Sequence, residues 1–396
     1  MLFKFSDFNR QEIKLSLTLF LVITINLIGR AYLRETNEPS LDEEIEEIIT
    51  DVGIIGLDIS VVKDGKVIFN RVYGDKNIET GQEYQLNDIC WIGSVSKTFV
   101  ATAIMQLYDE GKLNLDDDAQ KYLDFPLRNP FFRDTPITIR MLLTHLSSIF
   151  DGGPWYSYDF INSNKNPDYQ KYFKNYKPGK GYTYCNYNYN ILAAIIEGAT
   201  GERFDNYIRE KITTPLDMYG DFNCNNLDST RFVTVYHYDK SSKKYIDSHV
   251  PYKNYKYHLV DNYKLEETTG LLYPAAGMKT SSSELAKYMM MHMQKGHWNN
   301  NIILSENSEE EMRKIYPGTQ NYGLSFREYK GLVPNKTLVG QTGGGTLGEK
   351  TAMIFDPEGK YGFVIITNGS KSNEIDGYGD IHKPLIQVLN KHLIQK

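Results

Sequence analysis

The strongest constraint on the fold is a pair of β-hairpin patterns at opposite ends of the chain. Near the N-terminus, apolar residues alternate on both sides of the turn Lys63-Asp64-Gly65, and Asp-Gly is a strong hairpin signal. Near the C-terminus, the stretch "EKTAMIFDPEGKYGFVIITN" shows the same pattern around Pro357-Glu358-Gly359. From Leu113 to Tyr273, helical periodicity and loops rich in Tyr and Asn predominate, without a strong series of strands.

Strands that are distant in the sequence can share one sheet, so we expect a single composite domain of the α/β (α+β) class over residues 51–396. The middle of the chain would form a largely helical lobe beside the sheet. A cleft between sheet and lobe is then the natural place for a ligand. Helical periodicity and capping signals predict helices at about residues 40–50, 94–111, 137–146, 189–201 and 380–394.

The first residues differ in character from the rest of the chain. Residues 15–29 form an apolar run preceded by basic residues, which is shorter than the roughly 20 residues of a membrane-spanning helix and is typical of a signal peptide. An uncleaved anchor and a buried structural helix are the alternatives. We assign residues 1–34 to a signal peptide or membrane anchor, with membrane association through residues 13–29, and residues 35–50 to a polar linker and lead-in helix. Either membrane interpretation predicts an extracytosolic protein, secreted or membrane-anchored.

Composition excludes several kinds of function. The net charge of -6 and the absence of a lysine-arginine stripe argue against binding to nucleic acid. The three cysteines, Cys90, Cys185 and Cys224, are too few and too scattered for a disulfide framework or a zinc cluster. The eight histidines show no HExxH or paired spacing, so we expect no metal site.

The stretch "GSVSKTFV" places Ser94 and Lys97 one helical turn apart, directly after a glycine. A spacing of three sets both side chains on one face of a helix. A serine becomes a nucleophile when a base removes its proton, and a lysine can be that base only if apolar surroundings or nearby cations lower its pKa. The alternative is a serine that caps the helix and a lysine on its surface. Two further S-x-x-K matches lie outside predicted helices: Ser60/Lys63 and Ser241/Lys244.

Two further stretches carry candidate chemistry. Tyr184 and Asn186 flank Cys185 just before a predicted helix. A tyrosine beside a protonated lysine can lose its proton below its usual pKa of about 10 and relay it, while an asparagine amide can orient the lysine. The third stretch, "VGQTGGGTLGEKTAMIF", lets a backbone approach a ligand closely, with N–H groups facing a developing oxyanion. The alternatives are a packing tyrosine and a plain glycine turn.

Together and in this order, the three stretches resemble the motifs of a known family. S-x-x-K, Y-x-N and [KH]-T-G occur in serine hydrolases related to class C beta-lactamases, to D-amino-acid peptidases and to penicillin-binding proteins. The resemblance covers roughly residues 54–368. It implies a beta-lactamase/transpeptidase-like fold, with an antiparallel sheet flanked by helices plus a helical lobe. It also implies a serine hydrolase acting on an ester or amide, including a D-amino-acid peptide or a beta-lactam, with no cofactor and a small-molecule or peptide substrate.

The resemblance assigns a role to each candidate residue. Ser94 forms an acyl-enzyme, with Lys97 and Tyr184 as the general base. The backbone amides of Ser94 and Gly344 form the oxyanion hole. The implied substrate-binding residues are Asn186, Gln341, Thr342, Gly343 and Gly344. Cys185 is expected to pack inward and not to act as a nucleophile.

One departure from the family pattern bears on the substrate. Gln341 stands where the family usually has lysine or histidine. Loss of a charge-assisted hydrogen bond costs about 1.5–3 kcal/mol, so we expect an uncharged ester or amide to react better than a beta-lactam. Arg327 and the lysines near Lys330 are candidate replacements for the missing cation. A different interpretation is a non-catalytic beta-lactamase-like binding or scaffold protein.

Overall fold

The computed structural model describes residues 39–248, 263–374 and 376–395. The predicted leader, residues 1–34, lies outside the described residues, and the extracytosolic location inferred from it stays a prediction. Contacts divide the chain into two compact units, Met1–Glu47 and Ile48–Lys396. Among the described residues, no helix is long and apolar enough to cross a membrane.

The lead-in helix α2 spans Leu41–Val52, as predicted, and the boundary between the two units falls within it. Its start is a reciprocal capping box. The backbone N–H of Ser40 donates to a Glu43 carboxylate oxygen at 2.7 Å, and the Glu43 N–H donates to Ser40 Oγ at 3.3 Å. This pairing satisfies two backbone donors that the first turn of a helix would otherwise leave free.

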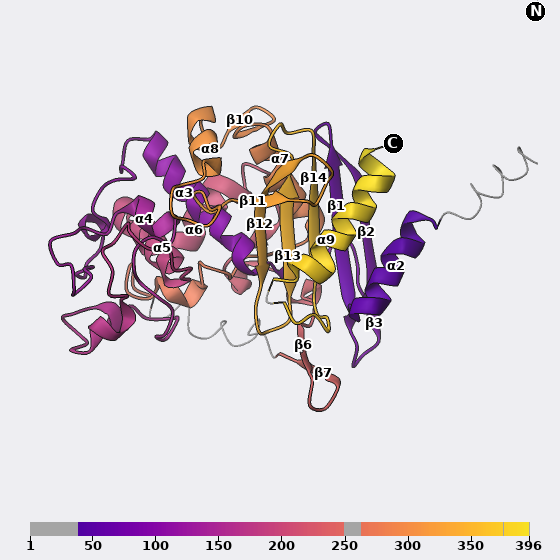
Figure 1. The fold of residues 1–396 in the computed structure, drawn as a ribbon, viewed down its shortest axis with the longest axis horizontal. Coiled ribbons are helices and arrows are strands. Elements are labelled where there is room, and N and C mark those ends of the chain that lie inside the picture. Colours follow the sequence, from indigo (N-terminus) through magenta and orange to yellow (C-terminus); the bar gives the residue numbers. More distant parts are fainter. Residues whose placement is uncertain (1–38, 249–262, 375, 396) are drawn as a thin grey trace, which may run out of the picture. The chain divides into compact units, whose positions relative to one another are not determined.

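The second unit is built on an antiparallel sheet in the order β11-β12-β13-β14-β1-β2-β3 (Figure 1). Both predicted hairpins are confirmed, and their strands share this sheet, with Leu57 of β1 opposite Thr367 of β14. In the first hairpin, Asp64 and Gly65 both have positive φ, as a tight two-residue turn requires. The strands are β1 Gly56–Lys63, β2 Lys66–Asn77, β3 Gln82–Glu83, β11 Arg327–Lys330, β12 Thr337–Gly344, β13 Lys350–Phe355 and β14 Tyr361–Thr367.

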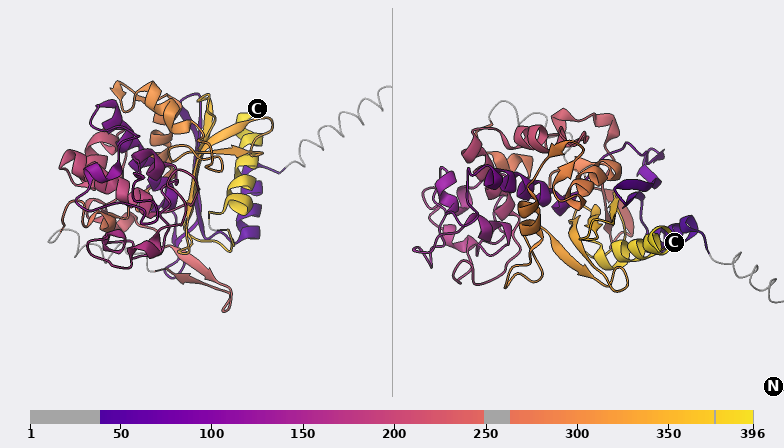
Figure 2. Two further views of the ribbon diagram at one scale, coloured as in Figure 1. Left: turned by 60° about the vertical axis from the view of Figure 1, so that its left-hand side comes forward. Right: turned by 90° about the horizontal axis from the view of Figure 1, so that it is seen from above.

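Helices cover the sheet and form the lobe. The buried helix α3 packs on α5 and α6, and α7 packs on β1 and β14. The helix α9 lies on the face of the sheet opposite to the lobe and α7 (Figure 2). All five predicted helical segments are present. The helices of this unit are α3 Ser96–Asp109, α4 Ile139–Leu143, α5 Tyr187–Thr200, α6 Phe204–Ile208, α7 Ser282–Met293, α8 Glu306–Arg313 and α9 Lys383–Leu389.

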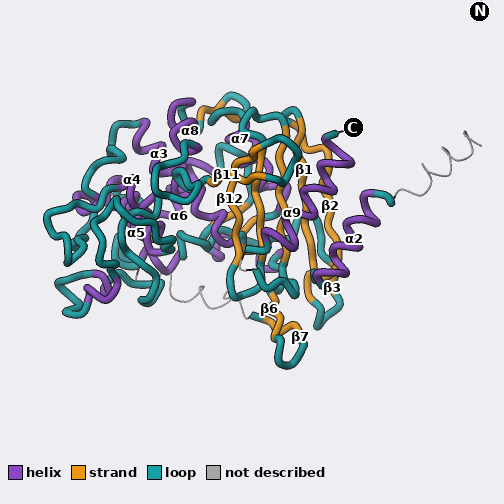
Figure 3. Tube along the Cα trace, in the orientation of Figure 1, coloured by secondary structure: helices purple, strands orange, loops and turns teal. Residues whose placement is uncertain are grey.

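The sequence predicts no strong series of strands between Leu113 and Tyr273, and besides the two-residue strand β5 (Gly220–Asp221) the described residues of this range contain one hairpin that the patterns did not indicate. A hairpin of β6 (Tyr236–Asp239) and β7 (Lys244–Asp247) extends beside the sheet (Figure 3). Its turn contains no glycine. Instead, the Asp239 carboxylate accepts hydrogen bonds from the Ser241 and Ser242 side chains, and Lys243 adopts positive φ. Because the turn depends on side-chain capping and not on an Asp-Gly pair, the usual hairpin signal is missing. Short two-residue strands complete the structure: β4 Cys90–Trp91, β5 Gly220–Asp221, β8 Lys279–Thr280, β9 His297–Trp298 and β10 Asn301–Ile302.

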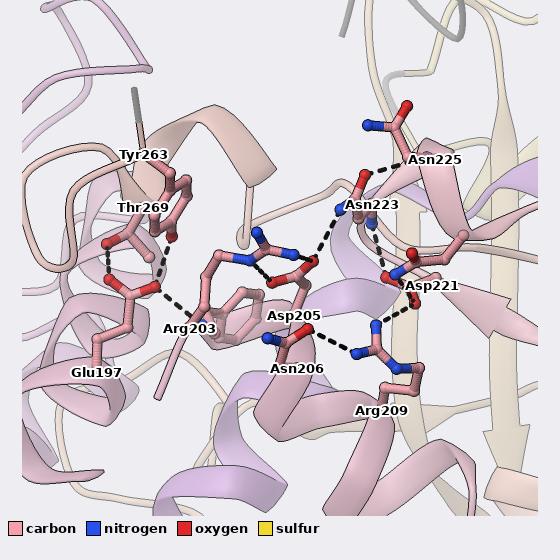
Figure 4. Close-up of polar contacts among 12 residues, drawn as sticks. Glu197, Arg203, Asp205, Asn206, Arg209, Asp221, Asn223, Asn225, Tyr263 and Thr269 are labelled. Atoms are coloured by element: carbon pink, nitrogen blue, oxygen red, sulfur yellow. Dashed lines mark hydrogen bonds and ion pairs between the residues drawn. The ribbon is translucent and has the colours of Figure 1, made fainter. Parts of the chain in front are cut away.

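Buried polar contacts hold the lobe together around α5 and α6 (Figure 4). The Glu197 carboxylate, at the end of α5, accepts from the hydroxyls of Tyr263 and Thr269. Next to it, Arg203 forms a two-pronged ion pair with Asp205, at 2.5 and 2.8 Å. Buried carboxylates with several donors lock the elements that supply those donors. These contacts therefore fix α5, the helix that follows Tyr184 and Asn186.

Candidate active site

A cavity of about 750 Å³ contains most of the predicted site residues. This volume is within the range of roughly 300–1,000 Å³ that is usual for small-molecule sites. Its walls come from both predicted parts of the fold, the sheet and the helical lobe. The predicted residues that line it are Ser94, Tyr184, Asn186, Gln341, Thr342 and Gly344.

Ser94 lies in a short 3₁₀ turn, Gly93–Val95, that leads from β4 into α3. Gly93 has φ +51°, and a Cβ on it would approach the backbone nitrogen of Gly344 to 2.7 Å. Likewise, a Cβ on Gly343 would meet the Ser94 nitrogen at 2.8 Å. Only glycine fits at both positions. The glycines therefore bring the backbone of β12 against the turn that carries Ser94.

Lys97 is fully buried on the first turn of α3, and its Nζ makes three hydrogen bonds. Nζ donates to Ser94 Oγ at 2.9 Å, to Asn186 Oδ1 at 2.8 Å and to the Ala275 carbonyl at 2.8 Å. Burial lowers the pKa of Lys97 to about 7, against the opposing attraction of Asp151. An ammonium group has three protons, so loss of one would leave a lone pair in this site that can accept the proton of Ser94.

Tyr184 reaches the same oxygen from the other side, because its Oη donates to Ser94 Oγ at 2.9 Å. The expectation of a lowered pKa for this phenol was wrong. Burial raises the pKa of Tyr184 to about 12. Lys97 Nζ lies over the ring, 5.0 Å from its centroid, so the cation faces the π-cloud and makes no hydrogen bond to Oη. The phenol stays protonated at neutral pH and is a proton donor in the resting site.

Asn186 is held by Asp151, a residue that no sequence motif indicated. Asp151 Oδ1 accepts from the Asn186 backbone N–H at 2.8 Å, and Oδ2 accepts from Asn186 Nδ2 at 2.8 Å. The amide oxygen of Asn186 is therefore turned toward Lys97. Cys185 is buried, as expected, and burial raises the pKa of its thiol well above the usual value.

Gln341 lies on β12, but its carboxamide forms hydrogen bonds with other groups of the protein. The side chain is 2% exposed, and Nε2 donates to Tyr322 Oη at 2.9 Å and to the Ser325 carbonyl at 3.0 Å. Both amide protons are therefore occupied. The next residue, Thr342, donates from Oγ1 to Asp376 Oδ2 at 2.9 Å.

Arg327, at the start of β11, lines the cavity. Its guanidinium stands over the rings of Tyr184 and Tyr322, 5.6 and 5.1 Å from the ring centroids. Within the described part of the chain it forms no ion pair, and its buried Nε has no hydrogen-bond partner. The other candidate cation, Lys330, has a side chain that is 78% exposed, and it is not part of the cavity wall.

The two other S-x-x-K matches do not form comparable pairs. On β1, Ser60 Oγ contacts Ser282 Oγ at 2.8 Å, whereas Lys63 Nζ donates to the Leu393 carbonyl. Ser241 lies in the exposed turn between β6 and β7, and Lys244 is the exposed first residue of β7. In the described residues, no three His, Cys, Asp or Glu side chains gather as a metal site would require.

Comparison with known protein families gives one broad match. A family model described as "Beta-lactamase" matches residues 41–386. Among curated proteins, "Protein flp" of Staphylococcus aureus (strain N315) is 31% identical over 193 residues, which is 47% of this chain and 38% of that protein. "D-alanyl-D-alanine-carboxypeptidase/endopeptidase AmpH" of Escherichia coli (strain K12) is 28% identical over 185 residues, 45% of this chain and 48% of that protein. The match thus spans less than half the length of these relatives.

Solved structures share the fold over most of the chain. An octameric penicillin-binding protein homologue from Pyrococcus abyssi superposes with a TM-score of 0.70 at 26% identity, covering 90% of this chain and 76% of that one. D-amino acid amidase from Ochrobactrum anthropi SV3, solved with L-phenylalanine amide, gives a TM-score of 0.67 at 19% identity, covering 88% and 97%. The second likeness concerns the fold alone.

Proposed function

Because the chain belongs to the beta-lactamase family, we propose that it is a serine hydrolase that cleaves an amide or peptide bond through an acyl-enzyme on Ser94. The predicted family and its fold class, an antiparallel sheet with helices and a helical lobe, are confirmed. The observation that carries the proposal is the double contact of Ser94 Oγ, at 2.9 Å from both Lys97 Nζ and Tyr184 Oη. A hydroxyl between a neutralisable amine and a protonated phenol has both a base and an acid within reach.

The proposed reaction begins when neutral Lys97 takes the proton of Ser94, whose oxygen attacks the substrate carbonyl. The backbone N–H groups of Ser94 and Gly344 would stabilise the resulting oxyanion. Tyr184 gives its proton to the departing nitrogen and is reprotonated from Lys97. Water then enters, loses a proton to the same relay and attacks the acyl carbonyl; the bond to Ser94 Oγ breaks, Oγ takes that proton back, and the acyl group leaves as a carboxylic acid. Asn186 keeps Lys97 aligned, and Asp151 keeps Asn186 aligned.

The direct test is intact-mass spectrometry after incubation with a fluorophosphonate and, separately, with benzylpenicillin. We expect one covalent adduct per chain, located on the peptide that contains Ser94. Reaction with neither probe would favour the binding or scaffold alternative, since such a protein needs the fold but no reactive hydroxyl.

For the substrate, we propose an amide or peptide with a free carboxylate on the leaving-group side. Arg327 supports this choice, because a guanidinium that lines a cavity and forms no ion pair with any described residue favours a carboxylate ligand; its one side-chain hydrogen bond among these residues is a long one, 3.5 Å, to Tyr182 Oη. This replaces the preference for uncharged substrates that was expected from Gln341. The name of the Escherichia coli relative, a carboxypeptidase and endopeptidase, describes an enzyme with such substrates.

Arg327→Gln should weaken the reaction with carboxylate-bearing substrates by about tenfold to over a hundredfold in kcat/KM, as loss of a charge-assisted pair of about 1.5–3 kcal/mol implies. The measurement compares a peptide that ends in a carboxylate with the same peptide ending in an amide. Lys330→Gln, on the same strand but outside the cavity wall, is the matched control and should change neither rate. An equal loss on both peptides in Arg327→Gln would count against the carboxylate contact.

Tyr184→Phe should lower kcat by roughly 10²- to 10⁴-fold, because the proton donor to the leaving group is removed while the ring and its packing remain. Amide substrates should suffer more than activated esters, whose leaving groups depart without a proton. Rates for a matched amide and nitrophenyl ester would show this difference. Equal losses on the two substrates would indicate that Tyr184 only positions Ser94.

A further inference from the structure

The cavity has an aromatic wall that the proposed reaction does not use. Trp91, Trp155 and Tyr273 all line it. The Tyr273 ring meets Trp91 at a centroid distance of 5.8 Å and Trp155 at 5.3 Å, edge to face in both pairs. Aromatic faces attract cations as well as apolar groups. The aromatic residues alone therefore do not indicate whether this wall binds a cation or an apolar group of the ligand.

Glu349 lies in the same wall of the cavity, and its carboxyl group favours a cation over an apolar group as the ligand of this wall. It directly precedes β13, lines the cavity and is only 5% exposed. Its Oε2 is buried and has no hydrogen-bond partner among the described residues. A buried carboxyl group without a partner is costly, and ordinary proteins avoid it. Burial raises the pKa of Glu349 to about 7, although a hydrogen bond from its own backbone and the charge of Lys350 oppose this rise.

The charge of Lys350 lowers the pKa of Glu349, but its ammonium group makes a hydrogen bond to a backbone carbonyl and no salt bridge to Glu349. Lys350 Nζ donates to the Gly345 carbonyl at 3.1 Å, and Lys279 Nζ donates to the Phe222 carbonyl at 2.5 Å. In the part of the chain that the structure describes, Glu349 forms no ion pair. A cation in direct contact with the Glu349 carboxylate would therefore have to come from a ligand. Trp91 Nε1, in the same wall, is likewise buried without a partner, so this wall offers a ligand both a donor and an acceptor.

Arg327 and Glu349 lie on opposite flanks of β12, the strand whose glycines contact the turn that carries Ser94. The strand order places β12 between β11 and β13. Arg327 pairs with Gly340, whereas Lys350, the residue after Glu349, pairs with Gly344. Four residues of extended strand correspond to about 13 Å. A positive and a negative group of the protein thus line the same cavity from opposite flanks of β12, with Ser94 beside the Glu349 end of this strand.

We propose that Glu349 and the aromatic wall form a subsite for the protonated primary amine of the substrate, on the carbonyl side of the scissile bond. The ammonium would donate to Glu349 and lie against the ring faces. This inference rests on the proposed function, because Ser94 and Arg327 define which side is the carbonyl side. The substrate class becomes short peptides or amino-acid amides with a free amino terminus, and an N-acylated substrate would leave Glu349 unpaired.

Binding to the Ser94→Ala protein tests the subsite without turnover. The probes are phenylalanine amide, of either hand, and its N-acetyl derivative, with dissociation constants measured by calorimetry. We expect phenylalanine amide to bind at least tenfold more tightly than the acetylated form. Adding Glu349→Gln to Ser94→Ala should remove this preference by lowering the affinity for phenylalanine amide alone. The control is Glu358→Gln, at an exposed carboxylate beyond β13, which should leave the preference intact.

Each result bears on the subsite alone. Equal affinities for the two ligands in Ser94→Ala, or no measurable binding of phenylalanine amide, would overturn it even if Glu349→Gln failed to fold. The subsite would also be overturned if Glu349→Gln weakened the binding of both ligands equally, since equal losses indicate a structural role for Glu349. Failure of the proposed function has a separate signature, the absence of a covalent adduct on Ser94 in the unaltered protein.

Discussion

Replacing Ser94 with alanine is expected to lower kcat/KM for any cleaved amide or ester by about 10⁴- to 10⁶-fold and to abolish covalent labelling. A loss of this size follows removal of a nucleophile, because the remaining oxyanion donors and binding contacts supply only part of the rate enhancement. Initial rates and adduct mass, measured on the same preparation, give both quantities.

The fold should survive this substitution, because Ser94 is only partly buried and lies in a cavity wall. Its hydroxyl accepts hydrogen bonds from Lys97 and Tyr184, and Lys97 keeps its hydrogen bonds to Asn186 and the Ala275 carbonyl when that hydroxyl is removed. Ser241→Ala, at the serine of another S-x-x-K match, is the matched control and should retain full activity. Labelling that persists in Ser94→Ala would falsify the assignment of the nucleophile.

Lys97→Met is expected to reduce kcat/KM by roughly 10²- to 10⁴-fold, the usual contribution of a positioned base. In the unaltered protein, the base works only when deprotonated, and the pKa of Lys97 is lowered to about 7. Activity should therefore rise with pH and level off above about pH 8. The pH profile of kcat/KM checks this prediction. Lys97 would be ruled out as the base if activity did not rise near pH 7, or if the same rise persisted in Lys97→Met.

The same lysine should make stability depend on pH. Its pKa is about 7 in the folded chain and near 10.5 when unfolded, so between these values the unfolded state binds one more proton than the folded state. The free energy of unfolding therefore falls as pH drops from about 10 to 7, by up to about 1.4 kcal/mol per pH unit, and this contribution is constant below pH 7. Denaturant unfolding at several pH values should show a smaller slope for Lys97→Met than for Lys244→Met, an exposed control.

Local patterns were sufficient for most of the secondary structure. The Asp64-Gly65 turn needs two residues with positive φ, and that requirement is visible in the residue types themselves. In helix α3, apolar pairs at Phe99/Val100, Ala103/Ile104 and Leu107/Tyr108 recur with helical period, so the sequence alone indicated it. The β6–β7 hairpin was missed because its turn is stabilised by Asp239 side-chain contacts, for which no short pattern is diagnostic.

The residues of the candidate site also fall into two groups: those that local sequence patterns indicated and those that only the structure revealed. Ser94 and Lys97 are one helical turn apart, so their contact follows from the helix alone. Asp151 and Glu349 belong to no motif, and their importance follows only from what surrounds them. For Arg327, the sequence raised the candidate but could not separate it from Lys330, since both are cations on one strand and differ only in burial.

The amino-acid sequence by itself determined the order of the three motifs, the hairpins and helices that carry them, and hence the family. These features depend on neighbours within a few positions, where backbone preference and side-chain spacing act directly. Only the tertiary structure decided the charge states and the groups that line the cavity: a lysine whose pKa burial lowers to about 7, a phenol kept protonated, a glutamine bonded inward, and Arg327 and Glu349, which form no ion pair with any described residue. Burial and pairing depend on atoms brought together from distant parts of the chain, so no local pattern contains them.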